Sequence, residues 1–363
     1  MANVILKGVT KKFGSFTALD DINIETKEGE FFFILGPSGA GKSTVFNLIS
    51  GILPVTKGEI FIGGEMVNKL EPRHRDVAVA FESYALYPNK TVYQNLEFPL
   101  LAPIRKSQYT AKEIDKIVRE TAELLHIEEL LDRLPSQLSG GQKQRVSLGR
   151  TLVRRPKVFL FDEPIAHLDA KLRHRMRGEL KRLQKEMGIS AIFATPDQLE
   201  AVSMADRVAI LNKGVIQQIG TPEEIYFQPA NLFVANMVGD PKINIFRGSV
   251  KKDGGVYYLC HKDFRLPMDK SAEKIVAGRD LSGDIDIGVR PTCFRLSNTK
   301  MGEGDIQTRV SFMQRMGDSQ VVKLDVGSFT FTTKVDQSVL YSIGDTVWFS
   351  LSGDKIFFFD PVA

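Results

Sequence analysis

The stretch FFFILGPSGAGKSTVFNLIS, residues 31–50, joins a short apolar run to the start of a helix through a glycine-rich turn. The run at residues 31–35 is apolar throughout, which is typical of a strand covered on both faces of a parallel sheet. The turn after it fits the spacing G-x-x-x-x-G-K-[ST], whose backbone N–H groups and helix N-terminus surround phosphate groups. This stretch predicts an α/β fold with a phosphate-binding loop at the end of a central strand.

The residues of this loop have different expected roles. Glycines allow successive N–H groups to turn inward around the β-phosphate of a bound nucleotide. Lys42 would reach the β- and γ-phosphate oxygens, and the hydroxyl of Ser43 would hold Mg²⁺. We expect ATP to be bound by a contiguous set of residues: Gly36, Ser38, Gly39, Ala40, Gly41, Lys42, Ser43 and Thr44.

A second apolar strand, in VFLFDEP at residues 158–164, ends in two acidic residues. Asp162 would stand at the C-terminal end of the strand, where a carboxylate can engage Mg²⁺ through its water shell. Glu163 follows directly and could polarise an attacking water molecule. Two acids after a strand are often ordinary surface, but the phosphate-binding loop favours the catalytic interpretation. These two motifs alone would fit any P-loop ATPase or a kinase.

Composition and patterning suggest how the chain is organised. At 363 residues, with 43% apolar and 25% charged residues, the chain is expected to form two globular domains. Residues 1–235 alternate apolar strands with helical patterns, and residues 83–155 or so are mainly helical. Thr110 and Glu113 predict a capping box at the start of one of these helices, and the turn Asn212–Gly214 predicts a hairpin. From residue 236 to 363, short alternating strands separated by glycine-rich turns predict an all-β domain, most simply a small barrel.

Several classes of function find little support in the sequence. The net charge of +4 comes from scattered basic residues, which gives little reason to expect a nucleic-acid partner. Cys260 and Cys293 match no metal-binding spacing and are expected to be inert thiols. No stretch approaches about eighteen consecutive apolar residues, so the chain is not expected to cross a membrane by itself. A role at a membrane would depend on a partner.

A third motif, LSGGQKQRV at residues 138–146, narrows the choice among nucleotide-binding proteins. Ser139, Gly140 and Gly141 precede a helix that is expected to begin near Gln142, which makes a second anion-binding helix N-terminus without a lysine. Two separate phosphate-binding sites in one chain suggest that a nucleotide is enclosed between two subunits. In order, GPSGAGKST, LSGGQ, FLFDEP and HLDA resemble the ATP-binding subunits of ABC transporters, and the resemblance covers the whole first domain.

Longer stretches resemble one branch of that family, the ATPases of importers of the maltose and glycerol-phosphate type. FESYALYPNKTVYQNLEFPL at 81–100 is similar to their coupling surface, while FVANMVGDPKINIF and IGVRPTCFRL are similar to their OB-like (TOBE-type) C-terminal domain. The resemblance implies a dimer beneath two permease subunits, at the cytoplasmic face of the inner (plasma) membrane. It also implies ATP-driven uptake of a sugar, a polyol such as glycerol or a glycerol-phosphate-like solute, with an external solute-binding protein as an indirect partner.

The resemblance assigns roles to residues outside the phosphate-binding loop. Phe13 would stack on adenine through its flat ring, although an ordinary place in the core is the alternative. The nucleotide of the opposite subunit would be contacted in trans by Ser139, Gly140, Gly141, Gln142 and Asp169. The permease subunits would dock near Ser83, Tyr84, Leu86 and Tyr87.

Three positions depart from the pattern of that family. Glu82 stands where the family has a glutamine that senses Mg²⁺ and the attacking water. Ala166 stands where a serine usually faces the opposing phosphate-binding loop. Pro196, in IFATPDQLEA at 192–201, stands where the family has a histidine that hydrogen-bonds the γ-phosphate. The metal ligands expected in this chain are Ser43, Glu82 and Asp162.

The stretch IFATPDQLEA also has a purely structural interpretation. It predicts a strand that runs directly into a helix, with Thr195 as the cap, Pro196 at the first helical position and Gln198 completing a capping box. Proline offers neither a side-chain hydrogen bond nor a backbone N–H. The strand end would therefore present no polar group from Pro196 to a nucleotide.

A dimer of this family has two nucleotide sites, and the substitutions at Glu82 and Pro196 affect only one of them. This pattern favours a specialised subunit over a general loss of function. Glu82 and Pro196 belong to the chain's own site, whereas LSGGQ, which would serve the partner's site, is intact. We hypothesise a non-equivalent pair, in which this chain binds ATP and hydrolyses it slowly beside a second, different ATPase. Three alternatives remain: a homodimeric importer ATPase that tolerates the substitutions, a soluble ABC protein outside transport, and a regulatory role of the C-terminal domain.

Overall fold

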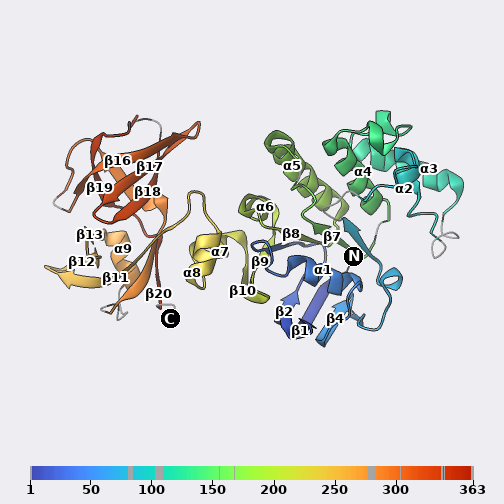
Figure 1. Cartoon of the computed structure of the whole chain (residues 1–363), viewed down its shortest axis with the longest axis horizontal. Coiled ribbons are helices and arrows are strands. Elements are labelled where there is room, and N and C mark those ends of the chain that lie inside the picture. Colours follow the sequence, from blue (N-terminus) through green and yellow to red (C-terminus); the bar gives the residue numbers. More distant parts are fainter. Residues whose placement is uncertain are drawn as a thin grey trace. The chain divides into compact units, whose positions relative to one another are not determined.

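The computed structural model of the chain describes residues 2–80, 85–102, 109–154, 156–166, 168–276, 281, 283–302, 304–336, 338 and 340–360. The chain divides into two compact units, Met1–Pro222 and Glu223–Ala363. Each unit has its own layers of secondary structure (Figure 1). Glu82, Ser83 and Tyr84, three residues to which the sequence assigned roles, lie outside the described residues.

The first unit contains a sheet built from β3 (Phe31–Leu35), β6 (Val77–Ala80), β7 (Val158–Asp162), β8 (Ala191–Thr195), β9 (Arg207–Asn212) and β10 (Val215–Gly220). In the described part of the chain its order is β10-β9-β3-β8-β7-β6, and all neighbours are parallel except β10 and β9. Every residue of β3 and β8 is buried, as their continuous apolar runs predicted. The hairpin predicted at Asn212–Gly214 joins β9 to β10.

A second, antiparallel sheet of the same unit is formed by β1 (Val4–Phe13), β2 (Phe16–Glu25), β4 (Lys57–Ile62) and β5 (Glu65–Met66). Helix α1 (Lys42–Ser50) lies between the two sheets (Figure 1). Its Val45, Leu48 and Ile49 join side chains of both sheets in one buried cluster. The helix that begins in the phosphate-binding loop is therefore fixed by apolar packing on opposite sides.

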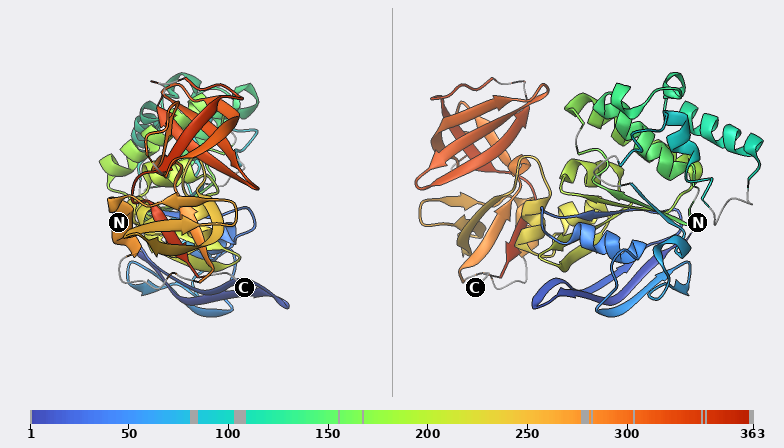
Figure 2. Two further views of the ribbon diagram at one scale, coloured as in Figure 1. Left: turned by 90° about the vertical axis from the view of Figure 1, so that its left-hand side faces the viewer. Right: turned by 45° about the vertical axis from the view of Figure 1, so that its right-hand side comes forward.

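Helices gather at the other side of this unit, away from the antiparallel sheet (Figure 2). The predicted helical region contains α2 (Val92–Glu97), α3 (Ala111–Leu124) and α4 (Gly140–Leu152), with short 3₁₀ turns at Glu128–Leu130 and Pro135–Gln137. A further 3₁₀ turn at Pro72–His74 precedes β6. The capping box predicted for α3 is confirmed, since Thr110 and Glu113 exchange side-chain to backbone hydrogen bonds. Two further helices, α5 (Ala170–Met187) and α6 (Gln198–Met204), follow β7 and β8.

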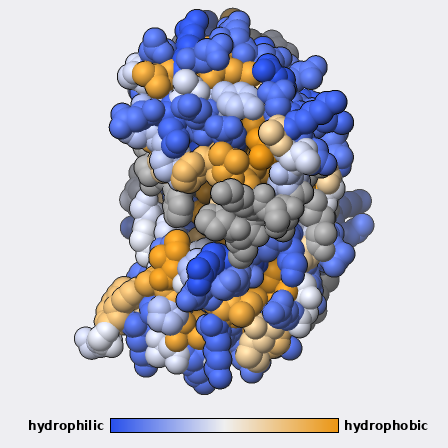
Figure 3. All heavy atoms as spheres, turned by 90° about the vertical axis from the view of Figure 1, so that its right-hand side faces the viewer, coloured by the Kyte–Doolittle hydropathy of each residue, from blue (hydrophilic) through white to orange (hydrophobic). Residues whose placement is uncertain are grey.

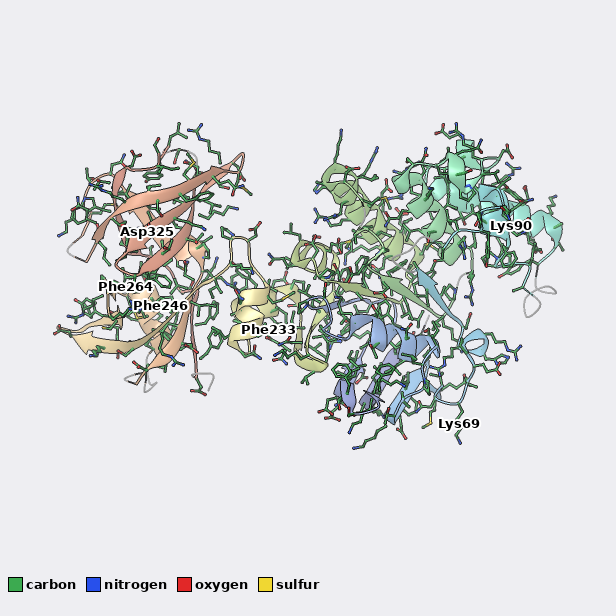
Figure 4. The ribbon with its side chains drawn as sticks, in the orientation of Figure 1. Lys69, Lys90, Phe233, Phe246, Phe264 and Asp325 are labelled. Atoms are coloured by element: carbon green, nitrogen blue, oxygen red, sulfur yellow. The ribbon has the colours of Figure 1, made fainter. Side chains whose placement is uncertain are left out.

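The second unit is mainly β, as predicted, and OB-like. Its first sheet has the order β13-β12-β11-β14-β20 and its second the order β15-β19-β16-β17-β18, in the described residues. Phe246 and Phe264, 5.1 Å apart between ring centroids, belong to a single core that draws on both sheets (Figure 4). The bounds are β11 Asn244–Asp253, β12 Val256–Cys260, β13 Arg265–Pro267, β14 Ile285–Val289, β15 Phe294–Ser297, β16 Ile306–Arg315, β17 Ser319–Val326, β18 Phe329–Asp336, β19 Thr346–Leu351 and β20 Ile356–Phe359.

In the described residues these sheets are accompanied by the helices α7 (Pro222–Phe227), α8 (Leu232–Met237) and α9 (Lys270–Val276), with a 3₁₀ turn at Pro291–Cys293. The fully buried Arg290 donates hydrogen bonds to the carbonyls of Ala235 (2.9 Å), Val238 and Tyr226 (3.0 Å). Because these carbonyls belong to α7, α8 and the residue after α8, both helices are held to the β unit. The boundary between the two units therefore lies between residues 222 and 223. The sequence pattern had suggested a domain boundary between residues 235 and 236.

A search for membrane spans among the described residues finds no helix that is both long enough and apolar enough to cross a bilayer.

Candidate nucleotide-binding site

The phosphate-binding loop connects the end of β3 to the start of α1, as the sequence indicated. Gly41 occupies the N-cap with φ = 110°, a left-handed conformation that favours glycine. A Cβ atom at this position would lie 2.7 Å from Leu19 Cδ2. Because glycine has no capping side chain, the first-turn N–H groups of α1 are left for another acceptor, such as phosphate.

Lys42 lies at the centre of this loop and is only 4% exposed. Its Nζ donates hydrogen bonds to the carbonyls of Gly36 (3.1 Å) and Pro37 (3.2 Å). The same ammonium lies 3.2 Å from Glu163 Oε1. The structure thus brings the predicted phosphate-binding lysine into direct contact with the predicted catalytic carboxylate.

The two acidic residues follow from the end of β7. Asp162 is the last residue of the strand, and the N–H of Glu163 donates to the Ala194 carbonyl of β8 at 3.0 Å. Glu163 has φ = 47°, in the left-handed region that residues other than glycine seldom adopt. Such a conformation persists only where neighbouring contacts hold it, and it is common at functional sites.

Mg²⁺ is implied by the chemistry of a nucleotide site, and the described donors fit it. Ser43 in the first turn of α1 offers a hydroxyl and Asp162 a carboxylate, the hard oxygen ligands that this ion prefers. Among the described residues there is no group of three or more His, Cys, Asp or Glu side chains able to hold a metal. Mg²⁺ at such sites is commonly held by one or two protein oxygens together with substrate phosphates and water. Glu82, the third expected ligand, lies outside the described residues.

Pro196 follows β8, at the same edge of the sheet as the phosphate-binding loop. Leu35 of β3 pairs with Thr195 of β8, and the N–H of Gly36 donates to the Thr195 carbonyl at 3.3 Å. Position 196 is therefore adjacent in the chain to a residue that is hydrogen-bonded to the first glycine of the loop. A polar side chain here would be well placed to act on a bound nucleotide, but proline supplies none.

The capping box predicted at this strand end is wrong. Helix α6 begins at Gln198, and its cap is Asp197, whose Oδ1 accepts from the N–H of Leu199 at 2.8 Å. Thr195 remains in the strand because its backbone pairs with β3. Its Oγ1 accepts from the N–H of Asp197 at 2.9 Å and donates to Glu200 Oε2 at 2.5 Å.

Glu200 is a buried acid that the sequence analysis missed. It is 3% exposed, and burial raises its pKa from 4.5 to about 7, although the hydrogen bond from Thr195 partly opposes this rise. A glutamate near the start of a helix ordinarily faces solvent, so its residue type gave no sign of burial. The only signal was the apolar pair Ala201 and Met204 on the same helix, which are also buried.

Arg173 is a second polar residue that the sequence did not single out. Its Nη2 donates to the carbonyls of Ala166 (2.8 Å) and Leu168 (3.0 Å), in the loop that follows the acidic pair. Its Nη1 lies 3.9 Å from Asp197 Oδ2. One guanidinium on α5 therefore connects the loop that carries Ala166 with the residue that follows Pro196.

The LSGGQ motif forms the N-terminus of α4. Ser139 is the cap and exchanges hydrogen bonds with Gln142, so the helix begins at Gly140, two residues before the predicted start. A Cβ atom on Gly141 would lie 2.4 Å from Leu172 Cδ2, and Leu172 N–H donates to Asp169 Oδ1 at 3.0 Å. The structure thus places the residues expected to act in trans next to one another.

Phe13 closes β1 at the hairpin with β2 and is 47% exposed. This exposure excludes the alternative in which its ring simply fills the core. Its pairing partner across the turn is Phe16, which is also exposed. An aromatic face is therefore accessible on the hairpin, as stacking with a base requires.

A groove of about 460 Å³ lies between the helical region and the strand end of β6. Tyr87 lines it and packs on Phe98 with ring centroids 4.5 Å apart, while the Arg150 guanidinium lies 4.6 Å from the Tyr87 ring. Burial lowers the pKa of Arg150, which also donates to the Ala85 carbonyl. Figure 3 shows the side of the molecule that carries α2 and α3, where hydrophobic side chains are exposed between hydrophilic ones. Of the residues expected to contact a permease, Tyr87 lines the groove and Leu86 is half-buried, whereas Ser83 and Tyr84 are outside the described residues.

Comparison with known proteins agrees with this geometry. The model of the family described as "ABC transporter" matches residues 19–166. The trehalose/maltose import ATP-binding protein MalK of Thermococcus litoralis is 44% identical over 342 residues, covering 91% of this chain and 90% of that protein. The sn-glycerol-3-phosphate import ATP-binding protein UgpC 1 of Rhizobium johnstonii is 38% identical, with 98% and 94% covered.

A solved structure extends the likeness to three dimensions. The ATP-binding cassette MJ0796, in a dimeric post-hydrolysis state bound to ADP and Pi, is 32% identical with a TM-score of 0.55. The match covers 60% of this chain and 98% of that one, so it concerns the nucleotide-binding unit. Together with the sequence relatives, it shows that this chain belongs to the ABC transporter family, among its import ATP-binding proteins.

Proposed function

We propose that this chain energises an importer for a sugar, a polyol such as glycerol or a glycerol-phosphate-like solute, as one of two non-identical ATPases. In this pair its own site binds ATP but hydrolyses it slowly. The observation that carries the proposal is Pro196, which follows the strand residue hydrogen-bonded to the phosphate-binding loop. Family membership and the names of the relatives support the importer class and its solutes.

The weakening follows from the chemistry at position 196. The resemblance places a histidine there, which donates a hydrogen bond to the γ-phosphate. Proline has no such donor, and removing one donor to transition-state charge typically costs roughly 10²–10³ in rate. Glu82 would add a negative charge near the polyphosphate, which opposes the build-up of further charge in the transition state.

Binding of ATP should survive these changes because it depends on other groups. Lys42 and the N-terminus of α1 supply the positive charge and N–H donors for phosphate, and neither involves Pro196. Mg²⁺, held by Ser43 and Asp162, would neutralise part of the phosphate charge. Phe13 would stack on the adenine.

The LSGGQ motif and Asp169, which would serve a partner's nucleotide, are both present in this chain. Ser139 caps α4 and leaves the first-turn N–H groups of Gly140 and Gly141 for an anion. Asp169 caps α5 beside them. A partner with an unimpaired loop and histidine would therefore meet the N-terminus of α4 and Asp169, although Ala166 offers it no hydroxyl. This is the arrangement that a non-equivalent pair requires.

The groove between β6 and the helical region is the proposed docking place of a permease. It is lined by apolar and basic side chains, among them Ile52, Arg73, Ala85, Tyr87, Phe98 and Arg150. An apolar groove with a basic rim suits a short permease helix that lies at the cytoplasmic membrane surface. In this proposal two permeases span the inner membrane, this chain works peripherally on its cytoplasmic face, and an external solute-binding protein acts indirectly.

The test is the ATPase rate of the purified chain. The unmodified chain alone should hydrolyse ATP slowly, and the double substitution Pro196→His with Glu82→Gln should raise the rate by about 10² or more. ATP affinity should change little, because the phosphate-binding loop is untouched. The measurement is steady-state phosphate release, with nucleotide affinity from isothermal titration calorimetry.

Two controls interpret the outcome. Adding Glu163→Gln to the double variant should abolish the gained activity, which would locate it at this site. Brisk hydrolysis by the unmodified chain would overturn the weakened site and favour a homodimer that tolerates the substitutions.

A further inference from the structure

Lys11 is a buried lysine on β1, two residues before Phe13. It is 7% exposed, and its Nζ donates a hydrogen bond to the Pro54 carbonyl at 2.8 Å. The same ammonium lies 4.9 Å from the centroid of the Phe13 ring. Among the described residues no carboxylate lies within ion-pair distance of it.

A buried ammonium without a counter-ion needs a compensating interaction, since its desolvation is costly. The Pro54 carbonyl supplies one, and the negative face of the Phe13 ring supplies another. The cation therefore covers part of one ring face. The exposed part of the ring remains open for a flat ligand.

Lys11 also connects the two parts of the nucleotide site. Pro54 lies four residues beyond the end of α1, and Leu53 next to it donates its N–H to the Asn47 carbonyl of that helix at 3.0 Å. The other end of α1 is the phosphate-binding loop. Through Pro54, the lysine ties the hairpin that carries Phe13 to the helix that begins in this loop.

The hairpin reaches the loop directly on β2 as well. Gly41 approaches Leu19 so closely that a Cβ would lie 2.7 Å from Leu19 Cδ2. Phe16, the partner of Phe13, lies three residues before Leu19, on the order of 10 Å along the strand. This is the range that a ribose and its first phosphates span between a base and the β-phosphate.

From these contacts we infer that Lys11 is a positioning residue for the nucleotide base. It fixes the Phe13 ring by a cation–π contact on one face, and it sets the ring's place relative to the phosphate-binding loop through Pro54. It acts on the base alone, since its ammonium contacts no residue of the loop in the described structure. The inference rests on the proposed stacking of adenine on Phe13.

The test compares two ligands on the full-length chain by isothermal titration calorimetry in EDTA, where hydrolysis is prevented. ATP carries the base and tripolyphosphate lacks it. Lys11→Met should weaken ATP binding by about tenfold and leave tripolyphosphate binding unchanged. Lys11→Arg, which keeps a cation for the ring, should restore most of the ATP affinity.

The chain offers a matched control on the same strand. Lys7 places its ammonium 5.0 Å from the Phe61 ring, away from the hairpin turn. Lys7→Met removes a similar cation–π contact and should change neither affinity. Equal losses for ATP and tripolyphosphate, or no loss of ATP affinity in Lys11→Met, would overturn the inference.

Phe13→Ala separates failure of this inference from failure of the proposed base platform. If Phe13→Ala binds ATP as tightly as the unmodified chain, the platform itself is wrong. If Phe13→Ala weakens ATP binding but Lys11→Met does not, only the role of Lys11 is wrong. Should Lys11→Met fail to fold, Lys11→Gln provides the same loss of charge with a polar side chain.

Discussion

Glu200 lies four residues after Pro196 and is buried against Thr195, which donates a 2.5 Å hydrogen bond to it. Its charged neighbours are Asp197, which favours the protonated form, and Arg173 and Arg177, which favour the ionised form. Burial dominates, and the pKa of Glu200 is raised to about 7. The polypeptide next to the strand end at Thr195 therefore contains an acid that titrates near neutral pH.

The sign of its effect on stability follows from the direction of the shift. Below pH 4.5 the carboxyl is protonated in both states, and between pH 4.5 and about 7 it ionises mainly in the unfolded chain. The free energy of unfolding should therefore fall as pH rises through this window, by up to about 3 kcal/mol. Glu200→Gln keeps an acceptor for Thr195 but does not titrate, so its advantage over the unmodified chain should grow from pH 4.5 to pH 8.

Urea unfolding at several pH values measures this difference. Glu123→Gln, an exposed acid on α3, serves as the control and should track the unmodified chain at every pH. A pH-independent difference between Glu200→Gln and the unmodified chain would contradict the prediction.

At the scale of elements, the groove depends on how α2 and α4 pack beside β6. Asn95 of α2 is buried and donates hydrogen bonds to the carbonyls of Tyr87, Lys90 and Thr91, which fixes the turn before the helix. That turn, which carries Lys90 (Figure 4), holds Tyr87 against Phe98. The Lys90 ammonium lies 5.4 Å from the centroid of the Phe98 ring. The Asn95 hydrogen bonds thus fix the backbone turn that forms one wall of the groove. Phe98, on the same wall, is 42% exposed.

A charge on the groove wall should prevent docking without affecting nucleotide binding. Phe98→Asp should lower the amount of chain recovered with its permeases from solubilised membranes by a factor of about ten or more, because an unpaired charge would be buried. Leu101→Asp is the control, since Leu101 is similarly exposed at 46% but does not line the groove. If both variants lose the permeases equally, a general loss of folding explains the result.

At the scale of the whole molecule, the boundary between the two units depends on tertiary contacts, which the alternation of strands and helices in the sequence does not reveal. The core around α1 is complete by residue 211, whereas Ile225, Val234 and Val238 are buried in the second unit. Arg290 fixes the helices that carry them. The first unit therefore ends at Pro222, the first residue of α7.

Truncation should show this boundary directly. A fragment of residues 1–222 should fold and bind ATP as the full chain does, because every residue of its core and loop is present. A fragment of residues 1–238 should bind more of the dye ANS, because it exposes the apolar side chains of α7 and α8. Equal dye binding by both fragments would place the boundary after α8, where the sequence pattern suggested it.

Local patterns predicted much of the fold because they reflect local physics. The apolar runs of β3, β7 and β8, the hairpin at Asn212–Gly214 and the cap at Thr110 all depend on neighbours in the sequence. The start of α6 was wrong because Thr195 is held by a strand 160 residues earlier in the chain, at Leu35. Side-chain contacts across the sheet cannot be read from such patterns.

In the candidate site, too, some residues could be predicted from the sequence and others could not. The phosphate-binding loop and the acidic pair were predicted from motif spacing, and the structure brings Lys42 and Glu163 together. Lys11, Arg173 and Glu200 were missed because their importance depends on burial and on partners distant in sequence. A sequence motif identifies the groups that face the substrate. The residues that hold those groups in place do not stand at a fixed distance from the motif in the sequence.

The contact between Lys42 and Glu163 has a consequence for the order of chemical events. One ammonium neutralises the carboxylate that is expected to activate water, and the same ammonium is expected to meet the γ-phosphate. An arriving phosphate would compete for Lys42 and so release the Glu163 carboxylate from this ion pair. Substrate binding would thereby free the carboxylate for a water molecule, so that the two groups meet only when a phosphate is present.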